Sequence, residues 1–301
     1  MTTPIPDFNA ALQAHALAVE ARLTKLADDH LAASPAARLI KAMRYGLLSG
    51  GKRLRPFLVI ESAGLFGVPA QAALNTAAAL ECVHCYSLIH DDLPAMDDDD
   101  LRRGRPTVHR AFDEATAILA GDGLLTFAFE ILALQSTHAD PAIRAELVLE
   151  LARAAGAAGM AGGQMLDLEA ESQALPAAAT LALQAMKTGA LIRFGCVAGA
   201  ILGKAPAAAR MALDRYGRAL GAAFQISDDL LDAEGDSAVV GKATAKDAAS
   251  GKATLVGELG IAGARDELQR QVAIAVAALQ DFGDGAERLA GAARFMALRR
   301  S

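Results

Sequence analysis

The sequence contains no tryptophan, and aromatic residues make up only 4% of its 301 residues. Alternating runs of β-branched and aromatic residues, the usual mark of strands, are missing as well. A sheet-rich fold is therefore excluded, and segments rich in alanine and leucine with helical spacing fill the chain. We predict an all-α fold, a single large helical bundle of about ten or more helices around a central cavity, with residues 1–301 as one domain.

Cysteine is also scarce, with only Cys82, Cys85 and Cys196 present. The first two have C-x-x-C spacing, but a zinc site needs four ligands and no second pair exists. A redox C-x-x-C usually opens a helix after a strand, whereas this pair lies inside an apolar helical run. Buried thiols in a reducing compartment are the favoured interpretation, with a redox motif as the alternative.

An excess of positive charge is absent, since the net charge is −6 and the calculated pI is 5.5. A nucleic-acid binder would carry a basic surface, so we expect no nucleic-acid partner. Apolar residues reach 53%, yet charged or polar residues interrupt every stretch that approaches the length of a membrane span. The first residues lack the basic start and apolar run of a signal peptide. We therefore predict a cytoplasmic protein without a membrane span.

Aspartate is abundant, above all between His90 and His109. Carboxylates this close repel one another unless cations lie between them, and ligands made only of oxygen suit a hard ion such as Mg²⁺. The arginines that follow would pair with phosphate oxygens. A solvated acidic loop is the alternative for this segment alone. The aspartates are Asp91, Asp92, Asp97, Asp98, Asp99 and Asp100, and the arginines are Arg102, Arg103 and Arg105.

A second acidic cluster lies in the segment F-Q-I-S-D-D-L-L-D. On a helix, Gln225, Asp228, Asp229 and Asp232 share one face, and apolar residues fill the other positions. Carboxylates on such a helix are costly unless a cation neutralises them. We predict that the two clusters face each other across a metal–phosphate site. An EF-hand is excluded, because neither cluster has that loop's Asp spacing, central Gly and closing Glu.

Three further segments carry candidate features. The loop G-G-K-R-L-R-P at 50–56 places cations beside a helix start, which is typical of a phosphate site, with a solvated helix–helix turn as the alternative. Gly189 in K-T-G-A-L favours a kink in its helix. Gln164, Asp167 and Glu171 share a helical face, and either support a lysine or metal-bound water or face solvent.

Five motifs, in the order in which they occur along the chain, resemble those of the trans-isoprenyl diphosphate synthases, most closely the bacterial farnesyl diphosphate synthases. The motifs are G-G-K-R-L-R-P at 50–56, the segment 81–109, G-G-Q at 162–164, K-T-G-A-L at 187–191 and the cluster at 224–232. The resemblance covers roughly residues 39–254. It implies an isoprenoid-synthase type of helical bundle that forms a homodimer.

The resemblance also implies a Mg²⁺-dependent prenyltransferase of isoprenoid biosynthesis. Its reaction would condense isopentenyl diphosphate with dimethylallyl or geranyl diphosphate, head to tail, to give farnesyl diphosphate. A geranylgeranyl diphosphate synthase and a non-catalytic partner subunit remain as alternatives. Partner subunits lose one aspartate cluster, whereas this chain keeps both.

Residue roles follow from the same resemblance. The implied metal ligands are Asp91, Asp92, Asp97, Asp228, Asp229 and Asp232. Isopentenyl diphosphate would be held by Lys52, Arg55, His84 and Arg103, and the allylic diphosphate by Arg102, Lys187, Lys242 and Lys252. Thr188 would lie near the developing cation, and Gln225, on the aspartate face, is a further catalytic and substrate-binding candidate. Tyr86 is the candidate floor for the prenyl tail. The glycine-rich segment with Lys242 and Lys252 would be a closing lid or a plain linker.

Overall fold

The computed structural model describes residues 6–170, 177–234 and 255–298. Helices dominate them, and the predicted all-α bundle of ten or more helices is confirmed. The short β1–β2 ladder is a feature that the sequence did not predict, because two residues are too few for an alternating pattern. In chain order the elements are α1 (Pro6–Leu31), α2 (Ala37–Leu47), α3 (Leu54–Gly64), α4 (Ala70–Asp91), β1 (Leu101–Arg102), β2 (Arg105–Pro106), α5 (Val108–Ala111), α6 (Glu114–Ala133), α7 (Pro141–Ala155), α8 (Met160–Ala170), α9 (Ala177–Gln184), the π-helix η1 (Ala185–Gly189), α10 (Ala190–Leu202), α11 (Ala207–Glu234), α14 (Leu255–Ala278), the 3₁₀-helix η2 (Gln280–Ala286) and α15 (Glu287–Leu298).

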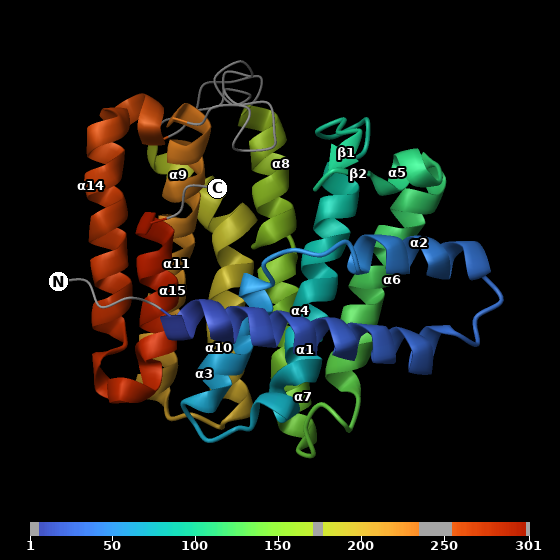
Figure 1. Cartoon of the computed structure of the whole chain (residues 1–301), viewed down its shortest axis with the longest axis horizontal. Coiled ribbons are helices and arrows are strands. Elements are labelled where there is room, and N and C mark those ends of the chain that lie inside the picture. The colour runs from blue at the N-terminus through green and yellow to red at the C-terminus, as the bar shows by residue number, and fades with distance from the viewer. Residues whose placement is uncertain (1–5, 171–176, 235–254, 299–301) are drawn as a thin grey trace.

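Two clusters of buried apolar side chains form the core, and they meet along α3 and α10. Helices α4, α6 and α7 contribute to the first cluster, and α11, α14 and α15 to the second. On α3, Val59 packs into the first and Phe57 into the second. Figure 1 shows α14 and α15 on one side of α10, with α4 and α6 on the other. The middle of the bundle is therefore the place where residues from both halves meet.

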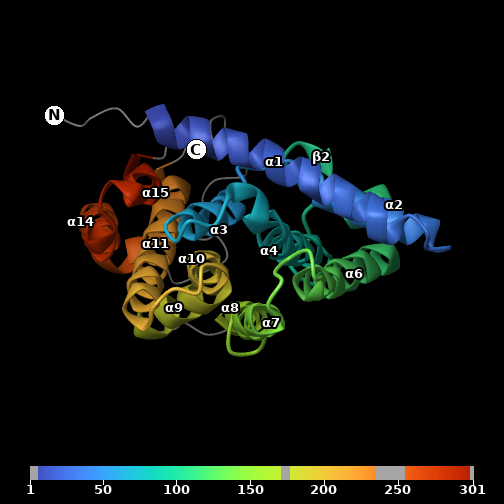
Figure 2. The same cartoon turned by 90° about the horizontal axis from the view of Figure 1, so that it is seen from below.

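Helix α1 crosses the outside of this bundle instead of running with it (Figure 2). It contacts α2, α3, α4 and α15. Its buried Phe8 lies in the second core cluster, and its buried Val19 and Leu23 lie in the first. Burying these side chains ties the two halves together, since each fully buried large apolar side chain contributes about 1.5–3 kcal/mol.

The cysteines behave as predicted. All three are free and buried. Burial raises the pKa of the Cys85 thiol to about 12 and raises that of Cys82 well above its ordinary value. The thiolates that redox or metal chemistry needs are therefore disfavoured, which confirms the interpretation as buried thiols.

Two helices in the described part of the chain are long and apolar enough to cross a membrane by length and composition alone. They are Glu114–Ala133 and Ala179–Leu202. Each contains charged residues, which are Glu114, Asp122 and Glu130 in the first and Lys187 and Arg193 in the second. The second is 67% buried over its most apolar window, and core helices of soluble proteins pass the same test. The absence of a membrane span stays a prediction.

Candidate active site

A cavity of about 490 Å³ opens between α3, α4, α8, η1 and α11, a size typical of small-molecule sites. Both aspartate segments reach it, so the structure brings together two motifs that lie far apart in the sequence. Of the residues proposed from the sequence, those that line it are Arg55, His84, Tyr86, Asp91, Asp97, Arg102, Lys187, Thr188 and Asp228. Apolar side chains complete the wall, among them Leu88, Met96, Met160 and Leu191.

Helix α4 ends at Asp91, and the following turn folds back on that residue. The backbone N–H of Asp97 donates to the carbonyl oxygen of Asp91 at 2.8 Å, which brings the two carboxylates to the same cavity. Burial raises the pKa of Asp91 to about 6; the Asp97 charge adds to this and Lys187 opposes it. The protein alone therefore does not fully compensate the negative charge at this position.

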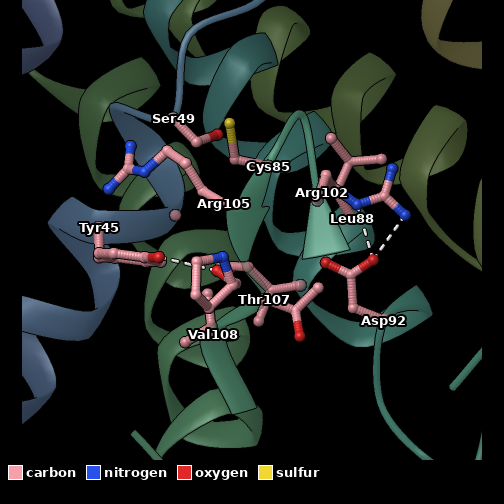
Figure 3. Close-up of a pocket in the computed structure, with 12 residues that line it drawn as sticks. Tyr45, Ser49, Cys85, Leu88, Asp92, Arg102, Arg105, Thr107 and Val108 are labelled. Carbon is pink, nitrogen blue, oxygen red and sulfur yellow. Dashed lines mark hydrogen bonds and ion pairs between the residues drawn. The ribbon is translucent and has the colours of Figure 1, made fainter. Parts of the chain in front are cut away.

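Asp92 has a different environment from its neighbour. It is only 3% exposed, and its Oδ1 atom accepts a hydrogen bond from Nε of Arg102 at 2.6 Å and forms an ion pair with Nη2 of the same arginine, also at 2.6 Å. Figure 3 shows this pair beside a separate small cavity of about 30 Å³, which lies between α2, α4 and the β1–β2 hairpin. Arg102 lines both cavities, whereas Asp92 lines only the small one. In this state Asp92 orients an arginine of the main cavity.

The second aspartate cluster also divides. Asp228 lines the cavity, whereas the buried Asp229 accepts from Gln184 Nε2 at 3.2 Å and from Gln225 Nε2 at 2.9 Å. Gln225 Oε1 in turn accepts from the Thr188 hydroxyl at 3.1 Å. Gln225 therefore fixes the Thr188 side chain, and Asp229 in turn holds Gln225. Asp232 is half-buried and lies outside the cavity lining.

The predicted kink in K-T-G-A-L is a π-helix, η1, which widens the turn that carries Lys187 and Thr188. Helix α8 approaches it closely, because a Cβ atom at Gly163 would overlap the backbone of Lys187. Lys187 Nζ lies 2.5 Å from Asp167 Oδ2 on α8. Such π-bulges occur often at functional sites, and this one directs a lysine and a threonine to the cavity.

Two residues that the sequence left undecided belong to this site. Gln164 lines the cavity, and Asp167 holds Lys187. The sequence showed only that these residues share a helical face, and it did not show whether that face points to the site or to solvent. Glu171, together with Lys242 and Lys252, lies outside the described residues.

The cations of the 50–56 loop point in different directions. Arg55 reaches the cavity, where its Nη1 atom lies 3.5 Å from Nε2 of His84. Burial, and then the charges of Arg55 and Arg103, hold the pKa of His84 well below its ordinary value, so its neutral ring accepts from the guanidinium. Lys52 is exposed, with its ammonium 5.9 Å from the centre of the Phe295 ring. Lys52 and Arg103 both lie outside the cavity lining.

Within the described residues, no three histidine, cysteine or acidic side chains form a ready metal cage. The cavity instead offers acidic oxygens on two sides, from Asp91 and Asp97 on one and Asp228 on the other, with Arg55, Arg102 and Lys187 nearby. Acidic groups and cations around one space, with apolar walls, can hold a phosphate-bearing ligand and its metal ions next to a hydrocarbon chain.

Comparison with known proteins agrees with this geometry. The model of the Polyprenyl synthetase family matches residues 36–286, and the chain therefore belongs to this family. The farnesyl diphosphate synthase of Escherichia coli K12 is 50% identical over 229 residues, which are 75% of this chain and 77% of that protein. The farnesyl diphosphate synthase of Geobacillus stearothermophilus is 45% identical over 233 residues, which are 77% and 78% of the two chains.

A solved structure, described as an FPP/GFPP synthase from Zymomonas mobilis, matches with a TM-score of 0.88 at 43% identity. It covers 98% of this chain and 100% of its own. The predicted isoprenoid-synthase fold and the resemblance to this family are confirmed, and the chain is a prenyltransferase.

Proposed function

We propose that this chain, as one polyprenyl synthase domain, is a farnesyl diphosphate synthase. It condenses isopentenyl diphosphate with dimethylallyl diphosphate and then with geranyl diphosphate. The observation that carries this proposal is the single cavity that both aspartate segments, three cations and an apolar wall share. The diphosphate groups require the charged part, and the prenyl chain requires the apolar part. The names of the relatives at 50% and 45% identity support the farnesyl product.

Magnesium is part of the proposal, and the donor set fits it. Mg²⁺ usually takes one or two protein carboxylates together with substrate phosphates and water, so Asp91, Asp97 and Asp228 suffice without a ready cage. Burial raises the pKa of Asp91 even though the charge of Lys187 opposes this, so a bound metal ion would favour the charged form of the carboxylate. When bound, the metal neutralises charge on the diphosphate leaving group. Asp92, Asp229 and Asp232 stay further candidate ligands.

The protein's own residues divide between the two substrates. Lys187 and Arg102 stabilise the charge that grows on the allylic diphosphate as its C1–O bond breaks, and Lys242 and Lys252 would add to it. Thr188, which Gln225 fixes, stands at the cation left behind. The remaining group orients isopentenyl diphosphate, so that its double bond attacks this cation. That group consists of Arg55, His84, Lys52 and Arg103. Loss of a proton, with the released diphosphate as base, completes the product.

One assay tests the function. Purified protein is incubated with Mg²⁺, labelled isopentenyl diphosphate and either dimethylallyl or geranyl diphosphate, and the products are sized by chromatography. A fifteen-carbon product supports the proposal. A mainly twenty-carbon product would favour a geranylgeranyl diphosphate synthase. No condensation without an added second protein would favour a non-catalytic partner subunit.

The proposal includes a cytoplasmic homodimer. Helix α6 supports the dimer, because it exposes Ile118 and Leu119 at 45% and 55% of their surface. Apolar side chains exposed side by side on one helix are typical of a surface that a second subunit covers. The buried, free cysteines agree with a reducing compartment.

Arg55→Ala is expected to raise the KM for isopentenyl diphosphate at least about tenfold and to change kcat less, since this arginine would hold a part of the substrate that does not react. The KM for geranyl diphosphate should stay within about twofold. Steady-state kinetics with each substrate varied in turn measures both. Equal increases in the two KM values would contradict the assignment of Arg55 to one substrate.

Tyr86→Ala is expected to shift the main product from fifteen to twenty or more carbons. Tyr86 lies on α4 five residues before Asp91 and lines the cavity. Its ring packs edge-on against the His90 ring, with 5.6 Å between the two ring centres. Its ring would stop the tail by exclusion, because overfilling a packed pocket costs about 1–3 kcal/mol. Ser87→Ala, next to it on the wall, is the matched control and should leave the product unchanged. An unchanged product from Tyr86→Ala would mean that another residue limits chain length.

A further inference from the structure

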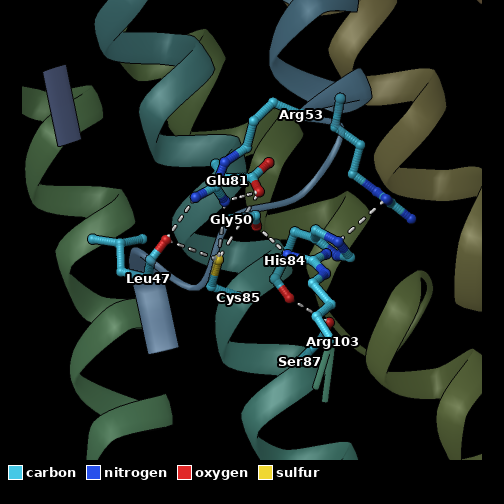
Figure 4. A network of polar contacts seen from close by, with 9 residues as sticks. Leu47, Gly50, Arg53, Glu81, His84, Cys85, Ser87 and Arg103 are labelled. Atoms are coloured by element: carbon cyan, nitrogen blue, oxygen red, sulfur yellow. Dashed lines mark hydrogen bonds and ion pairs between the residues drawn. The ribbon is translucent and has the colours of Figure 1, made fainter. Parts of the chain in front are cut away.

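The loop 50–56 contains a second arginine that does not reach the cavity. Arg53 is 4% exposed, and its Nη1 atom donates to Oε1 of the equally buried Glu81 at 2.5 Å. Its Nη2 atom donates to the carbonyl oxygen of Leu47 at 2.9 Å, and Sγ of Cys85 lies 3.8 Å from Nη1 (Figure 4). Two residues later in the chain, Arg55 lines the cavity. The two arginines therefore contact different parts of the protein, Arg53 the buried Glu81 and Arg55 the cavity.

The contacts of Arg53 tie three helices together at the edge of the cavity. Leu47 is the last residue of α2, Arg53 directly precedes α3, and Glu81 lies on α4. Arg53 itself has a left-handed backbone, with φ of 51°, so the chain turns sharply where its side chain is anchored. A single guanidinium therefore sets the position of the loop from which Arg55 begins.

Arg103 also rests on this loop. Its Nη1 atom donates to the carbonyl oxygen of Gly50, and a Cβ atom at position 51 would overlap its guanidinium. Gly51 has φ of 126°, which a residue with a side chain rarely adopts. The proposed cations for isopentenyl diphosphate, Lys52, Arg55 and Arg103, therefore all depend on the placement of one short segment.

The charge of Glu81 acts on three arginines, Arg53, Arg55 and Arg103, and Glu81 forms an ion pair with Arg53. Its charge acts on Arg55, where it raises the pKa of the guanidinium against the larger effect of burial. Yet its Oε1 atom binds Arg53, and Arg55 turns to His84 and the cavity. A buried carboxylate needs a partner, and without Arg53 the cations on which the Glu81 charge still acts are Arg55 and Arg103.

We propose that Arg53 and Glu81 form a positioning pair for the half of the site that binds isopentenyl diphosphate. Arg53 holds the loop in place and keeps the Glu81 carboxylate away from Arg55, which leaves the Arg55 guanidinium directed to the ligand. Neither residue of the pair contacts substrate. The inference rests on the proposed function, because it takes Arg55 as a ligand for isopentenyl diphosphate.

A double-mutant cycle of Arg53→Gln and Glu81→Gln tests the pair. Arg53→Gln alone leaves Glu81 to bind Arg55, so the KM for isopentenyl diphosphate should rise about tenfold, while that for geranyl diphosphate stays within about twofold. In the double variant two neutral amides can bond to each other and no carboxylate competes for Arg55. Its KM for isopentenyl diphosphate should therefore return to within about threefold of the wild-type value.

Tyr216→Phe is the control for loss of stability alone. Its buried hydroxyl, in the second core cluster, donates to the carbonyl oxygen of Leu289 at 2.7 Å, and this bond involves no residue of the loop 50–56 or of the Arg53–Glu81 pair. It should lower the melting temperature without a selective change in either KM. If Arg53→Gln does not fold, Arg53→Lys replaces it, because one ammonium retains the charge but lacks the fork that reaches Glu81 and Leu47 together. It should show a smaller increase with the same selectivity.

Two results would overturn the positioning pair. One is an equal rise of both KM values in the Arg53 variant, and the other is a double variant with a KM for isopentenyl diphosphate at least as high as that of Arg53→Gln. Failure of the proposed function looks different, because the wild-type protein would then form no condensation product at all.

Discussion

Asp91→Asn is expected to cut turnover by about 100-fold or more while making the metal-free protein slightly more stable. The loss of activity follows from the proposed metal site, where Asp91 and Asp97 meet at one end of the cavity. The gain in stability follows from the free-energy cost of keeping a charged Asp91 half-buried while no metal ion is bound. One substitution thus separates the function of this carboxylate from its effect on the fold.

The sign of the stability effect follows from the pKa of Asp91. Folding raises this pKa from an ordinary 3.8 to about 6, so the folded state binds the proton more tightly than the unfolded state. The contribution of this group to stability is fully present below pH 3.8 and is lost as the pH rises to about 6. Asparagine resembles the protonated acid, so the variant should keep this contribution at neutral pH.

Melting curves in a chelator, recorded at pH values from about 5 to 8, measure the difference between Asp91→Asn and the wild type. The difference should shrink toward the acidic end, since the wild-type carboxyl is then protonated as well. Asp98→Asn is a matched control, because Asp98 is exposed and lies outside the cavity lining. It should leave both turnover and melting temperature close to wild type. Near-wild-type turnover of Asp91→Asn at saturating Mg²⁺ would sink the metal-site proposal.

The site residues that could be predicted are those whose placement on their own helix costs free energy. Carboxylates at Asp91 and Asp228 stand on apolar helices, and this is unfavourable unless a cation or donor lies opposite. Helical periodicity alone predicts this, and the structure places both residues at one cavity. Asp92 and Asp229 have the same periodicity, but their partners Arg102 and Gln225 cannot be found from it.

The cations could not be sorted by the same means. Lys52, Arg53 and Arg55 lie within four residues and look alike in the sequence. Their directions depend on residues far along the chain, since Phe295 faces Lys52 and Glu81 binds Arg53. Charge and spacing predict a phosphate site near this loop, whereas only the packing of α4 and α15 distinguishes the residue that reaches the cavity.

The fold shows the same division between local and distant causes. The scarcity of aromatic and β-branched alternation was enough to predict an all-α protein. Gly189 marked a weak point in its helix, and a kink was the local expectation. The π-helix that replaces it also reflects the close approach of α8 at Gly163, a contact that no local pattern contains.

Lys187→Gln is expected to lower kcat by about 100-fold with little change in the KM for isopentenyl diphosphate. Lys187 lines the cavity from the π-helix, and its charge acts on Asp91, so it stands beside the proposed leaving group. Removing one preorganised donor at the place where charge develops typically costs about 10²–10³ in kcat. Initial rates with both substrates saturating measure this loss.

Asp167→Asn distinguishes the charge of Lys187 from its placement. The Asp167 carboxylate lies 2.5 Å from the ammonium, and an amide in its place still accepts a hydrogen bond but no longer attracts the charge. This variant should therefore lose less than about tenfold in kcat, because the lysine keeps its charge and its position on the π-helix. If Lys187→Gln instead kept wild-type kcat and raised the KM for isopentenyl diphosphate, Lys187 would belong with Arg55, and the division of the cavity between the two substrates would be wrong.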